Sequence, residues 1–223
     1  MKKIILLSLV IVFICSCINA QTSSTAVIKN TPFETAMLNN IKQLDTASTS
    51  TTLVTLANNF ERIGNAEKTK WQPFYYASYC YTALAFMTPD KSQIDGLADK
   101  AEGLLQQAAE IEKSNSEISC MFAMINSCRI MVDPMSRFQT KGKEVQSFLA
   151  KAKEENPSNP RIYLLQARVQ LRTPEGLGGG KNIAKASVET ALDKFKSFTP
   201  DNIIAPVWGE QQARVLLEKI NGQ

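Results

Sequence analysis

The chain has 223 residues, 44% of them hydrophobic, a formal net charge of +4 and no histidine. A charge this close to neutral carries no electrostatic footprint of nucleic-acid binding. Without histidine, the chain lacks the usual base of serine and cysteine nucleophile systems and the commonest transition-metal ligand. We therefore expect no enzyme, with no catalytic residue, no cofactor and no metal site, and no nucleic-acid partner.

Residues 1–20 have the composition of a signal peptide. Two lysines precede an almost continuous apolar run, and Ala20 is a small residue after which cleavage would leave Gln21 as the first residue. A lipoprotein signal stays open as an alternative, because Cys17 follows a small residue, and lipidation there would tether the protein to a membrane. We expect a periplasmic or secreted protein whose net charge falls to +2 with the loss of the two lysines.

After a flexible lead-in over residues 21–31, apolar residues recur at helical spacing along the rest of the chain. No segment shows the alternation of a β-strand, so the predicted fold class is all-α, with residues 32–223 as one domain. The predicted helices cover residues 32–44, 52–66, 71–87, 94–113, 116–132, 139–155, 159–172, 181–198 and 205–220.

Two segments, residues 104–118 and 148–162, read as copies of one unit set 44 positions apart. Leu105 aligns with Leu149, and in each copy an amphipathic helix ends in a polar Ser-Asn turn before a second helix begins. Repetition at this period is typical of a helical solenoid, in which each pair of antiparallel helices buries its apolar face against its neighbours. Such a scaffold is more often a binding surface than a catalyst.

The first helices of successive pairs are predicted to begin 45, 44 and 46 residues apart. These starts lie near Trp71, Ser116, Pro160 and Pro206. The predicted pairs are 71–87 with 94–113, 116–132 with 139–155, and 159–172 with 181–198.

The second helices of these pairs carry a small-large-small pattern that resembles the tetratricopeptide-like (TPR-like) family. The pattern is Ala101, Leu105 and Ala108 in one copy and Val145, Leu149 and Ala152 in the next. The resemblance implies a right-handed TPR-like solenoid, although the repeat of about 44 residues is longer than the family's repeat of about 34.

Other segments resemble the small exported TPR-like proteins of Gram-negative bacteria. They are Phe60-Glu61-Arg62-Ile63, residues 71–81, Val132-Asp133-Pro134, Asn159-Pro160-Arg161 and residues 173–180. This likeness covers nearly the whole chain after the signal peptide and implies an exported protein.

The first candidate binding surface is aromatic. On the helix predicted over residues 71–87, Tyr75 and Tyr79 share a stripe beside a second apolar stripe. A helix packed on two sides would explain both stripes. Alternatively, the aromatic patch serves a small-ligand or glycan-binding accessory protein.

The second candidate surface is basic. Arg161, Arg168 and Arg172 fall within about 40° of each other on the helix predicted over residues 159–172. Guanidinium groups bind carboxylates through two parallel hydrogen bonds. We therefore interpret the chain as a scaffold of the cell envelope whose arginines bind the carboxylates of a partner protein or an extended peptide. The alternative is that these arginines form a solvated basic face without a partner.

Three cysteines, Cys80, Cys120 and Cys128, follow the signal peptide, and each lies among apolar helix residues. Cys120 and Cys128 are separated by roughly 12 Å of helical rise, too far for a disulfide. We expect buried small hydrophobic side chains, and a disulfide from Cys80 to one of the others stays open.

Overall fold

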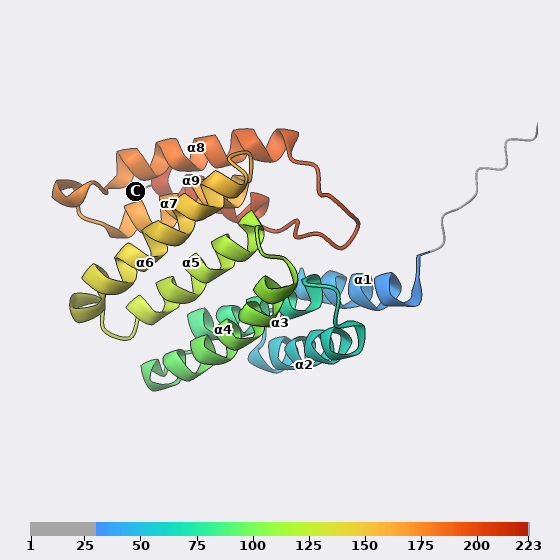
Figure 1. Cartoon of the computed structure of the whole chain (residues 1–223). Coiled ribbons are helices and arrows are strands. Elements are labelled where there is room, and N and C mark those ends of the chain that lie inside the picture. Colours follow the sequence, from blue (N-terminus) through green and yellow to red (C-terminus); the bar gives the residue numbers. More distant parts are fainter. Residues whose placement is uncertain (1–29, 223) are drawn as a thin grey trace, which may run out of the picture.

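The computed structural model describes residues 30–222, and this part of the chain is all-α (Figure 1). The predicted fold class is thereby confirmed. The helices are α1 (Pro32–Leu44), α2 (Ser50–Glu67), α3 (Gln72–Met87), α4 (Ile94–Ile111), α5 (Ser116–Ile130), α6 (Pro134–Glu155), α7 (Pro160–Arg172), α8 (Lys181–Ser197) and α9 (Glu210–Asn221), with short 3-10 helices at Lys91–Gln93 and Glu175–Leu177. The predicted signal peptide, with Cys17, Ala20 and Gln21, lies outside the described residues, as does the lead-in up to residue 29.

Helix caps explain the polar turn of the 44-residue repeat. The Asn115 side chain accepts a hydrogen bond from the Glu117 backbone N–H at 2.9 Å and caps α5. Asn159 accepts one from the Arg161 backbone N–H at 2.9 Å and caps α7. An asparagine at this position satisfies a backbone donor that the first helical turn leaves free. The repeated turn is thus a repeated helix start.

Two predicted helix starts are wrong by five residues. Helix α6 begins at Pro134, before the predicted residue 139, because the Asp133 carboxylate accepts from the Ser136 backbone N–H at 3.2 Å and Pro134 suits the first helical position. Helix α9 begins at Glu210, after the predicted start. Before it, Gly209 has a φ of +118°, and a Cβ atom there would lie 2.7 Å from the Phe195 ring.

The expected helix pairs pack against each other. Helix α3 contacts α4, α5 contacts α6, and α7 contacts α8. Helices α3 and α5 are buried on nearly all sides, since α3 also packs on α2 and α5, and α5 on α4 and α7. Because Pro206 lies in a loop, the predicted fourth repeat start is wrong. The TPR-like solenoid stays a prediction.

One apolar core runs from α1 to α7, and a second fills the space among α7, α8 and α9. The loop between α8 and α9, residues 198–209, runs back across the molecule (Figure 1) and places Ile204 in the first core. Cys80, Cys120 and Cys128 are buried and free, as expected for small hydrophobic side chains. No helix within residues 30–222 is long and apolar enough to cross a membrane.

Candidate ligand-binding site

A largely apolar cavity of about 610 Å³ lies between α5 and α7, with the ends of α3, α6 and α9 as its rim. We call it the basic cavity. Its volume falls in the usual range of small-molecule sites, roughly 300–1,000 Å³. Its apolar lining consists of Phe86, Met124, Ile130, Met131, Pro134, Phe138, Leu165, Val169, Leu171 and Leu216.

The charged residues of this cavity are all cations: Arg168 and Arg172 on α7 and Lys219 on α9. Arg168 and Arg172 are four positions apart, so they project from the same face of α7. Within residues 30–222, none of the three forms a salt bridge, whereas Arg129 and Arg137 are each paired with carboxylates. The cavity therefore combines an apolar wall with positive charges that no side chain of the described chain neutralises.

Arg168 is the most enclosed of these cations. Its Nη2 donates to the Gln212 Oε1 at 3.3 Å. Burial lowers the pKa of Arg168, and the neighbouring Arg172 also lowers that pKa, while Tyr79 opposes the shift. Both of these effects disfavour the cationic form, whereas a bound anion would favour it.

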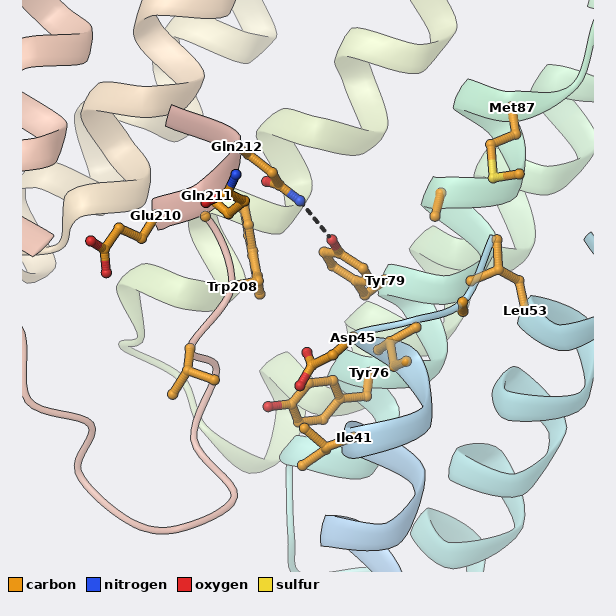
Figure 2. Close-up of a pocket in the computed structure, with 15 residues that line it drawn as sticks. Ile41, Asp45, Leu53, Tyr76, Tyr79, Met87, Trp208, Glu210, Gln211 and Gln212 are labelled. Carbon is orange, nitrogen blue, oxygen red and sulfur yellow. Dashed lines mark hydrogen bonds between the residues drawn. The ribbon is translucent and has the colours of Figure 1, made fainter. Parts of the chain in front are cut away.

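A second cavity, of about 480 Å³, lies between α1, α3 and the start of α9 (Figure 2). We call it the tyrosine cavity, since Tyr76 and Tyr79 line it together with Trp208. Its charged lining residues are the acids Asp45 and Glu210. In Figure 2 the Tyr79 hydroxyl faces Gln212, whose Nε2 donates to it at 3.4 Å.

A third cavity, of about 640 Å³, is strongly polar, and we call it the acidic cavity. Its charged lining residues are Glu112, Glu117, Glu155 and Asp201. Neither the acidic nor the tyrosine cavity has a lysine or arginine in its lining, so neither offers a cation to an anionic ligand.

Two of the residues singled out from sequence, Tyr75 and Arg161, lie inside the protein. The Arg161 Nη1 donates to Glu117 Oε1 at 2.9 Å, and its Nη2 donates to the Pro206 carbonyl at 2.6 Å. The Tyr75 hydroxyl accepts from Trp208 Nε1 at 2.8 Å and donates to Glu117 at 3.5 Å. Both side chains are fully buried, so neither presents a surface to a ligand.

The structure thus separates the predicted site residues. Arg168 and Arg172 line the basic cavity, and Tyr79 lines the tyrosine cavity. Sequence reasoning missed Lys219, Met124 and the other apolar residues of the basic cavity. They come from helices far apart in sequence, and the local signal was the apolar Leu165, Val169 and Leu171 interleaved with the arginines of α7.

One comparison with known proteins identifies a close relative. The solved structure of the HusA haemophore from Porphyromonas gingivalis superposes with a TM-score of 0.78 and is 38% identical in sequence. The match covers 86% of this chain and 94% of that one. A scan against family models and a search of curated proteins gave no match.

This match corrects one expectation and supports another. The predicted protein or peptide partner is wrong, because a haemophore is named for carrying haem, a small molecule. This relative is a binding protein and not an enzyme, in agreement with the expectation that the chain is no enzyme. Among residues 30–222, no group of three or more His, Cys, Asp or Glu side chains is placed to hold a metal ion.

Proposed function

The chain belongs to the family of the HusA haemophore, and we propose that it binds haem as cargo in the basic cavity. Haem is a flat apolar macrocycle with propionate carboxylates on one edge. The proposal rests above all on one observation: Arg168, Arg172 and Lys219 surround an apolar cavity without a salt bridge inside the described chain. Apolar walls suit the macrocycle, and the cations suit the propionates.

Charge favours the basic cavity over the tyrosine cavity and the acidic cavity. The tyrosine cavity carries Asp45 and Glu210, and the acidic cavity carries four carboxylates. Propionates placed there would find no cation and would meet like charges, such as Asp45 or Glu112, that form no salt bridge within residues 30–222. Volume does not discriminate, because all three cavities fall in the range of small-molecule sites.

Residues of the apolar wall would supply most of the contact with the macrocycle. Phe86 and Phe138 offer aromatic surface, and Met124 and Met131 offer flexible, polarisable side chains. Since the sequence has no histidine, the commonest protein ligand of haem iron is missing. Of the other residue types that serve as axial ligands, only methionine lines this cavity.

The same proposal gives the helix pairs and the chain's first residues a role. We expect this carrier to work outside the cytoplasm, in accord with the predicted signal peptide cleaved between Ala20 and Gln21. The stacked helix pairs, as a TPR-like scaffold, would hold α5 and α7 at the spacing that the cavity requires.

The direct test is a haem titration followed by absorbance in the Soret region, with the chain from Gln21 onward. We expect saturable binding, weakened roughly 10- to 100-fold by Arg168→Ala, because a hydrogen bond to a charged group contributes about 1.5–3 kcal/mol. Arg62→Ala is the matched control, since Arg62 is an exposed arginine of α2 outside the basic cavity. Unsaturable haem uptake, or equal affinities for the two variants, would refute the assignment.

A further inference from the structure

Gln212 connects the two cavities through its side-chain amide. Its Oε1 accepts from Arg168 Nη2 at 3.3 Å, and its Nε2 donates to the Tyr79 hydroxyl at 3.4 Å (Figure 2). Arg168 lines the basic cavity, whereas Tyr79 and the half-buried Gln212, at the start of α9, line the tyrosine cavity.

Arg168 differs from Arg129, Arg137 and Arg161 in the kind of group that its guanidinium bonds to. Arg137 donates to both carboxylate oxygens of Asp95, at 2.7 and 2.8 Å. Arg129 bonds to Asp99 and Glu102, and Arg161 to Glu117. In each of those cases an acid both orients the guanidinium and neutralises it. Arg168 is oriented by a neutral amide, so its charge remains available.

Arg168 determines which end of the Gln212 amide faces it, and the Tyr79 hydroxyl anchors the other end. A guanidinium has only donors, whereas an amide has a donor end and an acceptor end. The Nε2 end is bound to the Tyr79 hydroxyl and the Oε1 end to Arg168. In the opposite orientation the amide N–H groups would face the N–H groups of Arg168, and no hydrogen bond could form between them. Burial raises the pKa of Tyr79, so this hydroxyl stays neutral at physiological pH. The amide therefore occupies one donor of Arg168 and leaves the remaining donors for a ligand.

We propose that Gln212 is a specificity-determining residue, which positions Arg168 without neutralising it and thereby selects porphyrins with free carboxylates. The inference rests on the proposed function of the basic cavity. A glutamate at position 212 has nearly the same shape but would pair with Arg168, as Asp95 pairs with Arg137. The guanidinium would then be neutralised before any ligand arrives, and the added charge would repel propionates.

The experiment compares haem with haem dimethyl ester, whose carboxylates are masked, as ligands of the wild type, Gln212→Glu and Gln211→Glu. Gln211 is the matched control: it is exposed and lines a small cavity with Arg168 and Lys219, but it makes no hydrogen bond to Arg168, so its replacement adds the same charge nearby without the direct contact. We expect Gln212→Glu to weaken haem binding roughly 10- to 100-fold and to leave the affinity for the ester within about twofold of the wild type. Gln211→Glu should change both affinities by less than about threefold.

A third variant, Tyr79→Phe, changes no charge and releases the amide from its anchor. We expect it to weaken haem binding severalfold while the ester affinity stays unchanged, a pattern that a general loss of structure would not give. The wild type could bind haem with an affinity that depends on Arg168, while Gln212→Glu and Gln211→Glu have the same haem affinity. That result would refute the role of Gln212 and leave the proposed function standing. If the wild type binds no haem, the proposed function itself fails.

Discussion

Arg161 and Glu117 form a buried ion pair, with Nη1 2.9 Å from Oε1 and the arginine side chain fully enclosed. The guanidinium carbon also lies 4.7 Å from the centre of the Phe198 ring, and Nη2 reaches the Pro206 carbonyl. The pair thus ties α7 to α5 and holds the loop before α9 against both. Burial raises the pKa of Glu117, although Arg161 opposes that shift.

Replacing Arg161 by alanine should destabilise the fold severely. The change leaves the Glu117 carboxylate buried without its cation, which costs about 3–5 kcal/mol in comparable pairs. Chemical denaturation followed by circular dichroism measures the loss. Arg214→Ala is the control, because Arg214 pairs with Glu210 on the surface and such pairs contribute at most about 1 kcal/mol. Similar losses for the two variants would show that the buried pair is not a structural tie.

This pair also shows why the sequence analysis misjudged one arginine. Helical spacing correctly puts Arg161, Arg168 and Arg172 on similar angles of α7, but it does not tell what each turn of the helix faces. The first turn meets Glu117 of α5 and the loop at Pro206, while the later turns meet the open basic cavity. The burial of Arg161 and the exposure of Arg168 and Arg172 to the cavity are set by tertiary packing, which the sequence of one helix does not predict.

The aromatic wall should contribute to haem affinity independently of charge. Phe138→Ala removes apolar surface from the rim of the basic cavity, and we expect roughly 5- to 30-fold weaker binding, corresponding to about 1–2 kcal/mol of lost burial. The salt dependence of binding should not change. Leu177→Ala, which removes an exposed apolar side chain outside this cavity, should leave the affinity unaltered. A Phe138→Ala variant with wild-type affinity in the titration would exclude contact with this part of the wall.

Exposed Arg172 should act mainly through long-range attraction. We expect Arg172→Ala to weaken haem binding roughly two- to fivefold at low salt, and less at high salt, because surface charges are weak and screened. Titrations at two ionic strengths measure both effects. A loss that persists unchanged at high salt would instead indicate a direct, desolvated contact with the ligand.

The pair of Asp95 and Arg137 should make stability depend on acid pH. Hydrogen bonds from Arg137 hold the pKa of Asp95 below its ordinary value of 3.8. A lowered pKa in the fold means that the contribution to stability is present above pH 3.8 and is lost as the pH falls through the folded-state pKa. Asp95→Asn should therefore make the loss of stability below that pH shallower in thermal melts, whereas Asp201→Asn, at an exposed acid without a salt bridge, should not. An unchanged acid profile for Asp95→Asn would contradict the assignment.

Local sequence patterns predict where the helices begin better than they predict which helices pack together. The repeated Ser-Asn turns correctly indicate helix starts, since Asn115 and Asn159 cap α5 and α7. Asp133-Pro134 was ambiguous by the same logic: it ends one helix and begins the next within a few residues, and only the first role was recognised. Lys219 and Met124 could not be assigned to the basic cavity, because nothing in the sequence brings α9 and α5 to the same side of α7.

The position of the iron in a crystal of the haem complex tests the central claim most directly, through an anomalous difference map recorded at the iron absorption edge. The account predicts one strong peak within the apolar part of the basic cavity, between α5 and α7, with a propionate bound to Arg168. A peak in the tyrosine cavity or the acidic cavity, or on the outer surface, would contradict it.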